Sequence, residues 1–482
     1  MTFRKAILWS VGGQAVSYSI LFICSVIVAR LLSPREMGVF AIAMATIGIL
    51  NVLVAFNIGT YIIREKALEQ RMVDTAFTVN AATATTVAIA IALCSLCERY
   101  VFHSPDVARV LLPLALTPLI GIFEFRAAAM LQREMNFRIL SIVQTFKGLI
   151  AAGTVITLAL NGFSYMSLAY GNVVAALLSA IWINGIAPRH MSFRFSLVGA
   201  RSMVTFGIRM MSIGGLATLS SRLADVILGY VLGLASLGLY SRASSISALV
   251  FENIYGAITR VVFVRMSEDY RTKQTVRATF LRSFQLILAT LWPIQIGLAI
   301  FSGPFIYYLY GQRWLPAATP LSLLMIAQTI TLCFGMNWEL FVLKDETAKQ
   351  TRLEVLRSTI GLAFFAICCM FGITAAALGK IAEAVLGVVL YRPHINRLAE
   401  VEQGCIERII CQSGVLTVAA TAPALILMVT NHWSHLIPIG QIIASIIVGI
   451  LLWLATLAGL RHPMMGEFDV IVRKFVPKNS SG

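Results

Sequence analysis

The sequence predicts an all-α polytopic membrane protein with about fourteen transmembrane helices, and three observations carry this prediction. First, 58% of the 482 residues are hydrophobic and only 12% are charged, whereas about a quarter of the residues of a soluble domain are charged. Second, apolar runs of more than about eighteen residues recur along the whole chain, and each can cross a hydrocarbon core about 30 Å thick. Third, the segments between these runs are short, so we expect no sizeable soluble domain.

The apolar runs, taken in order, give fourteen expected spans. The first run follows Arg4 and Lys5 but lacks a small-residue cleavage site, so we interpret it as a retained helix and not as a secretion signal. The expected spans are 7–29, 38–63, 76–96, 107–130, 139–160, 164–186, 203–232, 238–264, 280–303, 318–343, 354–372, 373–391, 409–430 and 435–460.

The distribution of basic residues predicts the orientation of the chain. With the N-terminus in the cytoplasm, the inner segments hold 25 of the 38 Lys and Arg residues and the outer loops hold five. This bias follows the positive-inside rule, so both termini are expected to be cytoplasmic. The net charge of +16 is scattered over short loops, so it indicates topology and no nucleic-acid partner.

Two stretches at an offset of 200 residues read alike. They are LLSPREMGVFAIAMA at 31–45 and VLGLASLGLYSRASS at 231–245, and they align Gly38 with Gly238. Each stretch joins the first helix of a six-helix set to the second. Glycines recur there because tight turns and close helix contacts need residues without a Cβ.

A second echo appears at an offset of 210 residues. NGFSYMSLAYGN, beginning at Asn161, matches MFGITAAALGKIA, beginning at Met370, so that Gly162 aligns with Gly372. Six is an even number of helices, so both halves enter the membrane from the same side and form parallel repeats with the substrate site between them. The expected divisions are 1–200 for the first six helices, 201–400 for the second six, and 401–482 for two extra helices and a cytoplasmic tail.

Charged residues within the spans are the candidate site. Each costs roughly 2.5–3.5 kcal/mol by insertion scales, so each needs a partner, a cavity or a route to the interface. Arg222 and Asp225 share a helix face, and Arg242 lies one turn into the next span from the same outer surface. Two arginines against one aspartate predict a net-positive vestibule for an anion. The alternative is that these are paired structural charges.

Other polar residues within the spans are candidates for the same cavity. Arg209 and Lys147 either snorkel to the interface or line the cavity, and Lys380 with Glu383 is as well explained by a structural pair. The polar and aromatic residues suit sugars, although each taken alone also suits helix packing. The further substrate-binding candidates are Arg209, Lys147, Glu252, Asn253, Gln14, Tyr18 and Lys380.

Four motifs resemble a known family. LLSPREMGVFAIA from Leu31 resembles its first outer turn, LQREMNFR at 131–138 its loop after helix 4, LGLYSRA at 237–243 its helix 7–8 turn, and YGQRWLPAATPLSLL at 310–324 its entry into helix 10. The chain therefore resembles the polysaccharide-transport (Wzx-type) oligosaccharide flippases of the multidrug/oligosaccharidyl-lipid/polysaccharide (MOP) superfamily.

The resemblance implies a function. Such a flippase moves undecaprenyl-diphosphate-linked oligosaccharide repeat units from the cytoplasmic to the periplasmic face of a bacterial inner membrane, by alternating access, for exopolysaccharide or lipopolysaccharide biosynthesis. It needs no cofactor, and its partners are the lipid bilayer and the polysaccharide polymerase or export machinery. Arg222 and Arg242, with Arg209 and Lys147, would meet the diphosphate. By analogy with lipid II flippases, the last two helices would hold the prenyl tail. Those flippases carry basic residues in helix 1, whereas this chain has none between Lys5 and Arg30.

Two other classes of protein compete with this interpretation. A MATE-like small-molecule exporter coupled to H⁺ or Na⁺ needs a buried acidic site in its first helices, and the first three expected spans contain no carboxylate. A polymerase or glycosyltransferase needs a catalytic loop or paired carboxylates, but the outer loops are too short, so we expect no enzyme. If transport is coupled to H⁺ or Na⁺, Asp225 and Glu252 are the candidate ion-binding residues because of their depth.

Overall fold

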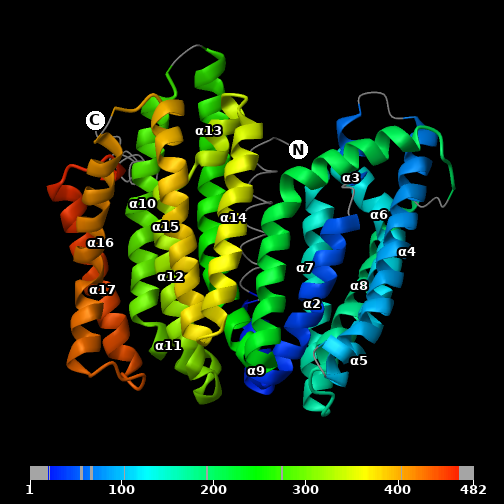
Figure 1. The fold of residues 1–482 in the computed structure, drawn as a ribbon, viewed down its shortest axis with the longest axis horizontal. Coiled ribbons are helices and arrows are strands. Elements are labelled where there is room, and N and C mark those ends of the chain that lie inside the picture. Colours follow the sequence, from blue (N-terminus) through cyan, green and yellow to red (C-terminus); the bar gives the residue numbers. More distant parts are fainter. Residues whose placement is uncertain are drawn as a thin grey trace, which may run out of the picture. The chain divides into compact units, whose positions relative to one another are not determined.

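The computed structural model describes residues 20, 22–54, 58–65, 69–101, 104–190, 194–272, 275–402 and 404–465. Within these ranges every regular element is a helix (Figure 1). A short apolar helix, Phe22–Leu31, precedes α2 (Pro34–Val54), α3 (Ile58–Arg64), α4 (Gln70–Val101), α5 (Pro105–Leu114), α6 (Leu116–Arg133), α7 (Phe137–Leu160), α8 (Met166–Ile186), η1 (Pro188–His190), α9 (Ala200–Arg271), α10 (Arg277–Ile300), α11 (Ser302–Tyr310), η2 (Gln312–Ala317), α12 (Ala318–Thr331), η3 (Leu332–Phe334), α13 (Asn337–Leu343), α14 (Thr347–Cys369), α15 (Ile373–Leu398), α16 (Cys405–Thr430) and α17 (Ile439–Gly459).

The predicted all-α membrane architecture is confirmed. Among the described residues, eleven helical segments are long and apolar enough to cross a membrane, so the chain is a multi-pass membrane protein. Three expected spans account for the difference from fourteen. Span 7–29 lies mostly outside the described residues, spans 203–232 and 238–264 run together in α9, and span 354–372 falls in the charge-rich helix α14. The number fourteen stays a prediction.

The first outer turn is built by a capping box. Ser33 precedes α2, and its backbone N–H donates to Oε2 of Glu36 at 2.6 Å, while the Glu36 N–H lies 3.4 Å from the Ser33 Oγ. Pro34 occupies the first helical position, where its missing N–H costs nothing. The letters SPRE therefore fix where the helix begins.

The two repeated turns pack against each other through their aligned glycines. A Cβ on Gly38 would lie 1.7 Å from the carbonyl oxygen of Leu234, and a Cβ on Gly238 would lie 1.8 Å from the carbonyl oxygen of Pro34. The contact is reciprocal, because Pro34 and Leu234 are themselves 200 residues apart. Gly233, at φ 83° and ψ 169°, breaks α9 just before this contact. The glycine recurs in both turn sequences because the backbones of the two turns are in direct contact.

The second echo also has a backbone counterpart. Gly162 and Gly372 have φ values of 84° and 112°, which L-residues with side chains rarely adopt. Gly372 immediately precedes α15, and Gly162 comes four residues before α8. The aligned glycines thus mark equivalent turns between helices.

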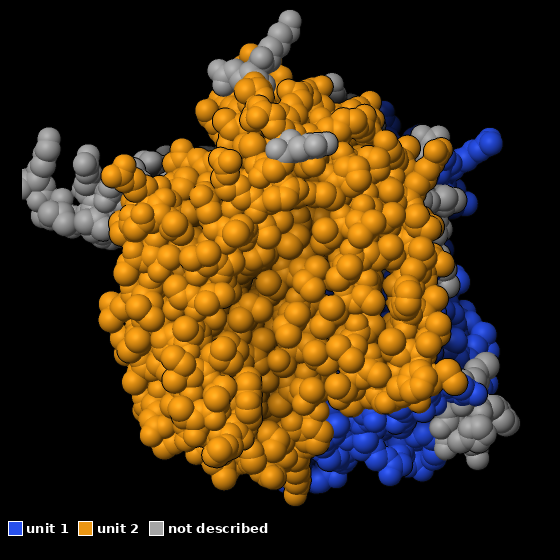
Figure 2. Space-filling view, turned by 60° about the vertical axis from the view of Figure 1, so that its left-hand side comes forward, with its two compact units in different colours: residues 1–241 blue, residues 242–482 orange. Residues whose placement is uncertain are grey.

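The chain divides into two compact units, residues 1–241 (unit 1) and residues 242–482 (unit 2), coloured separately in Figure 2. In unit 1, α7 packs against α8, and α4 packs against α5 and α6. In unit 2, α15 packs against α12 and α14, and α16 packs against α10 and α17. The boundary lies inside α9, so the expected divisions at residues 200 and 400 stay predictions.

Two crossed ion pairs tie together neighbouring loops of unit 2. Lys344 Nζ donates to Glu400 Oε1 at 2.8 Å, and Arg397 donates to Glu346. Hydrogen bonding from Arg397 lowers the pKa of Glu346, and hydrogen bonding from Lys344 lowers the pKa of Glu400. Both carboxylates are therefore ionised, and the loop after α13 is held against the loop after α15.

We predict that Gly38→Ala destabilises the protein by about 1–3 kcal/mol, the usual cost of forcing an atom into packed structure. The reason is that the backbone carbonyl of Leu234, unlike a side-chain tip, cannot move aside. Thermal unfolding in detergent measures the effect. The control is Gly153→Ala on α7, which meets nothing within 4 Å. Equal melting temperatures for the two variants would contradict the reciprocal contact.

Candidate functional site

Arg222 is a half-buried cation in the first part of α9. Its guanidinium lies 3.6 Å from the Asp225 carboxylate, one turn away, and 39% of the side chain is exposed. The side chain lies across α2 at Gly48, where a Cβ would come within 2.8 Å of Nε. Nε itself has no hydrogen-bond partner among the described residues. Arg222 thus combines a loose ion pair with exposed donors, as an anion-binding group requires.

Arg242 occupies a different environment, in unit 2. Only 8% of its surface is exposed. Its Cζ lies 5.2 Å from the ring centroid of Tyr310 and 5.6 Å from that of Trp314, distances typical of cation–π contacts. The residues at 237–243 and 310–324, singled out as separate motifs in the sequence, therefore meet here. The contact gives Arg242 a packing role beside any role toward substrate.

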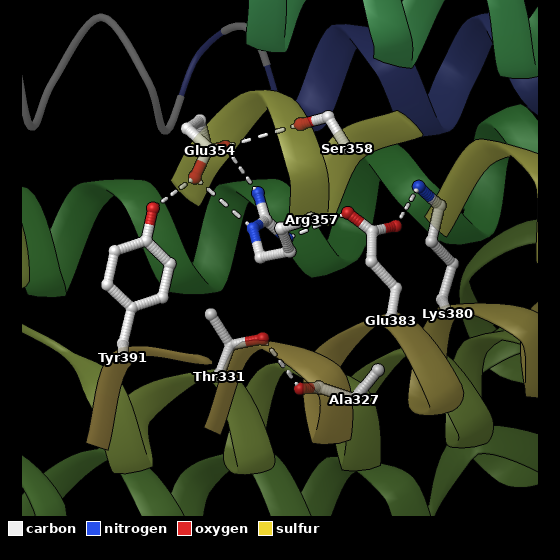
Figure 3. A network of polar contacts seen from close by, with 8 residues as sticks. All are labelled: Ala327, Thr331, Glu354, Arg357, Ser358, Lys380, Glu383 and Tyr391. Atoms are coloured by element: carbon white, nitrogen blue, oxygen red, sulfur yellow. Dashed lines mark hydrogen bonds and ion pairs between the residues drawn. The ribbon is translucent and has the colours of Figure 1, made fainter. Parts of the chain in front are cut away.

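A network of partly buried charges joins α14 to α15 (Figure 3). Arg357 donates to Glu354 at 2.5 Å and to Glu383 at 2.7 Å. Lys380 donates to Glu383 at 2.8 Å, and the Tyr391 hydroxyl donates to Glu354 at 2.9 Å. Two carboxylates face two cations, so the network is electrically balanced. The predicted pair of Lys380 and Glu383 forms, and its contact with substrate stays a prediction.

Two glycines make room for this network. A Cβ on Gly361 of α14 would lie 2.4 Å from Cγ of Glu383. A Cβ on Gly387 of α15 would lie 2.5 Å from the Phe334 ring and 3.3 Å from Cδ of Arg357. Because these glycines have no side chain, the charged side chains fit between α14 and α15. Gly361 leaves room for Glu383, and Gly387 leaves room for Arg357.

Lys147 also has a partner, within unit 1. Its Nζ donates to Oε2 of Glu124 on α6 at 3.0 Å, and the hydroxyl of Ser179 on α8 lies 3.3 Å from Oε1 of the same carboxylate. The side chain of Lys147 is one-third exposed. It therefore contributes less spare positive charge than Arg222, and its binding of substrate stays a prediction.

A second buried pair bears on the exporter alternative. Arg126 on α6 is 5% exposed and donates to Asp74 at 2.7 Å. Helix α4 begins at Gln70, six residues before the expected span 76–96, so the helix contains a carboxylate that the expected span does not. Its charge is already neutralised by Arg126.

An apolar groove of about 790 Å³ lies in unit 2 between α10, α11, α16 and α17. Helix α10 contributes Pro293 and Gly297, and the other walls are almost entirely apolar. Two side chains of the lining are bonded to backbone carbonyls: Trp453 donates to the carbonyl of Ala289 at 3.1 Å, and Tyr308 donates to the carbonyl of Ile437 at 2.7 Å. Such a groove accommodates a long hydrocarbon chain.

The remaining predicted site residues lie on or before α9. Glu252 is exposed on α9. Arg209 and Asn253 also belong to α9, but their side chains are not part of the description, and Gln14 and Tyr18 lie outside the described residues. Within the described residues, no group of three His, Cys, Asp or Glu side chains could hold a metal ion.

Sequence reasoning missed several partners. Glu354 lies three residues before Arg357, and this helical spacing was a readable signal. Glu124 was readable as a carboxylate inside a span. The stacking of Arg242 on Tyr310 and Trp314, and the contribution of α10 and α11 to the groove, had no local signal because they depend on tertiary packing.

The fold and these intramembrane features define a polytopic helical membrane protein. The chain superposes on the lipid II flippase MurJ in its inward closed conformation with a TM-score of 0.70 and 13% identity, covering 95% of this chain and 100% of MurJ. It also superposes on an inward-facing multidrug resistance MATE transporter of the MOP superfamily with a TM-score of 0.61 and 14% identity, covering 79% of this chain and 94% of that one. At these identities the likeness shows the fold alone.

Residues 27–319 match the model of the polysaccharide biosynthesis protein family, and the chain belongs to that family. It is 26% identical over 332 residues to the succinoglycan biosynthesis transport protein ExoT of Rhizobium meliloti (strain 1021), covering 68% of this chain and 67% of ExoT. It is 20% identical over 322 residues to the lipopolysaccharide biosynthesis protein WzxC of Escherichia coli (strain K12), covering 66% and 65%. It is 21% identical over 486 residues to a membrane protein in the cps region of Klebsiella pneumoniae, covering 98% of both.

We predict that Arg357→Met lowers the free energy of unfolding toward the lower end of the about 3–5 kcal/mol expected for breaking a buried ion pair. The loss arises because Glu354 and Glu383 keep their charges without their shared cation. Denaturation in detergent measures it. Arg352→Met, an exposed position on the same helix, is expected to change stability by less than about 0.5 kcal/mol. Equal stabilities of the two variants would exclude a stabilising network.

Proposed function

We propose that this protein is a flippase that carries an undecaprenyl-diphosphate-linked oligosaccharide from the cytoplasmic to the periplasmic face of a bacterial inner membrane by alternating access, for exopolysaccharide or lipopolysaccharide biosynthesis. The observation that carries the proposal is the long apolar groove, in a family member that also holds half-buried intramembrane charge. A substrate with a hydrocarbon tail and an anionic, hydroxyl-rich head needs both surfaces.

The groove between α10, α11, α16 and α17 is the proposed site of the prenyl tail. Its lining is almost without polar surface, and the hydrogen-bonding groups of its Tyr308 and Trp453 are already bonded to backbone carbonyls. An apolar chain gains roughly 25 cal/mol for each Å² that it removes from water. The tail is thus guided while the head crosses.

Arg222 is the proposed contact for the diphosphate. A diphosphate with several sugars cannot cross hydrocarbon unaided, because burying its charge and its unpaired hydroxyls costs tens of kcal/mol. Arg222 has exposed donors and only a 3.6 Å contact with Asp225, so it can exchange that contact for phosphate oxygens. Lys147 and Lys380 are bonded to glutamates and are secondary candidates, together with Arg209, Arg242, Glu252, Asn253, Gln14 and Tyr18.

A MATE-like ion-coupled exporter is the weaker alternative. Likeness to MATE transporters is a likeness of fold and extends equally to MurJ. A coupling carboxylate in the first helices should be available to a cation, whereas Asp74 is bonded to Arg126 and Glu124 is bonded to Lys147. The names of ExoT and WzxC as proteins of succinoglycan transport and lipopolysaccharide biosynthesis also favour the flippase.

The topology and partners form part of the same proposal. The excess of Lys and Arg in the inner segments supports cytoplasmic termini, and the division into six, six and two helices follows the two sequence echoes. The expected partners are the bilayer and a polysaccharide polymerase or export complex. The proposed activity is transport without catalysis or a cofactor, and an H⁺ or Na⁺ gradient is the proposed energy source.

We predict that Arg222→Ala slows flipping of a fluorescent undecaprenyl-diphosphate oligosaccharide in proteoliposomes by about 10–100-fold. The loss corresponds to one hydrogen-bonded charge pair, about 1.5–3 kcal/mol. Arg201→Ala, an exposed arginine on the same helix, is the matched control and should flip at the wild-type rate. A folded Arg222→Ala that flips normally would remove Arg222 from the substrate path, and a wild type that moves only small cations would overturn the flippase.

We predict that Gly297→Phe slows the same reaction about tenfold without lowering the melting temperature. A Cβ on Gly297 meets nothing within 4 Å and the residue lines the groove, so the ring fills space meant for the tail. Gly153→Phe, at an exposed and equally open position on α7, serves as the control. The effect should vanish with a lipid whose prenyl chain is short. An unchanged rate with the full-length lipid would show that the tail does not use this groove.

A further inference from the structure

In unit 2, the helical segment that follows η2, residues 318–343, is interrupted in its last third. After η3 the chain passes through Gly335 and then Met336, which has φ 60° and ψ 15°, before α13 begins. The backbone N–H of Met336 donates to the Tyr255 hydroxyl on α9 at 2.7 Å. The break is therefore stabilised by a side chain from another helix, since a left-handed non-glycine residue costs about 1–3 kcal/mol unless its surroundings hold it.

A buried carboxylate follows this break directly. Glu339 lies in the first turn of α13, and only 7% of its surface is exposed. No ion pair to Glu339 forms among the described residues, and its carboxylate accepts its own backbone N–H. Its neighbours Met336 and Leu340 belong to the largely apolar core of unit 2. An isolated charge in such surroundings costs several kcal/mol, so the group has to be neutralised.

The charged groups on the neighbouring helices are engaged elsewhere. On α9, the Tyr255 hydroxyl lies within electrostatic range of Glu339, and Arg260 donates to its own helix. On α15, His394 and Tyr391 contact the ring of Phe341, two residues and about 200° around the helix from Glu339.

The remaining cations near α13 are paired. Lys344 at its end is bonded to Glu400, and Arg392 on α15 is bonded to Glu407. On α14, Arg357 is shared between Glu354 and Glu383. Lys344 and Arg357 would each have to break an existing ion pair in order to neutralise Glu339. Arg392 has a buried Nη1 without a hydrogen-bond partner among the described residues, but its ion pair is with Glu407 and not with Glu339.

We propose that Glu339 is a proton-binding site: the carboxylate at the start of α13 takes up a proton from water before it is enclosed in these apolar surroundings and returns the proton to water when the surroundings open. A metal cation is the poorer occupant, because hard cations need several oxygen ligands, whereas a proton needs one. The Tyr255 hydroxyl, which accepts from Met336, keeps its own hydrogen to donate to the ionised form.

The consequence for transport rests on the proposed flippase function. If uptake and release of this proton occur on opposite faces, one lipid is exchanged for one proton. A gradient of one pH unit then shifts the equilibrium distribution of the lipid by up to about tenfold. Glu339 would thus link the flipping reaction to the proton gradient.

Infrared difference spectroscopy of the purified full chain tests the site without reference to flipping. Spectra taken across a pH titration in H₂O and D₂O should contain the C=O band of a protonated carboxyl. Glu339→Gln should remove the band, and the exposed control Glu69→Gln should retain it. Tyr255→Phe should shift it without removing it. A band that survives Glu339→Gln, or that is absent from the wild type, overturns the proposal. Thermal unfolding checks that each variant is folded.

Proteoliposomes then test coupling. With a pH gradient, wild type and Glu69→Gln should accumulate the fluorescent lipid in one leaflet, while Glu339→Gln should distribute it as it does without a gradient. Accumulation by Glu339→Gln at the wild-type level overturns the coupling role.

If a Na⁺ gradient at equal pH drives accumulation and Na⁺ abolishes the infrared band, the occupant is sodium and the proton assignment is wrong. If wild type flips nothing, the proposed function fails, and the infrared band still decides the proton site.

Discussion

The high cost of an uncompensated charge in hydrocarbon governs the arrangement of this chain. The described intramembrane ions mostly occur as bonded sets, such as Asp74 with Arg126 and Glu124 with Lys147. Glycines stand where the charged side chains need room, as Gly361 does for Glu383. Against this background two groups differ: Arg222, whose pair is loose and partly open to solvent, and Glu339, which has no described counter-ion. These two groups, which are not held in a tight ion pair, are therefore the strongest candidates for a functional role.

The fold was largely predictable because membrane helices are specified by local hydropathy. The capping box of Ser33 and Glu36 and the aligned glycines of the two echoes were also readable, since both depend on residues close in sequence. The count of spans was less secure, because α14 carries the charges of an internal network and α9 continues through the single break at Gly233. Charge lowers hydropathy whether or not a partner neutralises it, and the partner is invisible in one sequence.

The candidate site was predictable in its residues and not in its pairings. Arg222 and Asp225 were found from their spacing, and the structure forms that pair. That Arg242 lies beside them in a vestibule stays a prediction; its described contacts are with the rings of Tyr310 and Trp314, about seventy residues later in the chain. Glu339 lies near the end of an apolar run, a position that by itself indicates a residue at the membrane boundary. Only the break at Met336, and the helices around it, place that carboxylate in an apolar interior.

The meeting of Gly38 with Gly238 limits how the two halves of the chain can diverge. A side chain at either glycine would collide with a main-chain carbonyl oxygen of the other turn. A substitution at one glycine therefore cannot be compensated by a substitution at the other. These two positions are therefore locked to the same residue type. The aligned residues four positions further on, Ile42 and Arg242, already differ in type. The asymmetry that transport of an anion needs can arise only away from this contact.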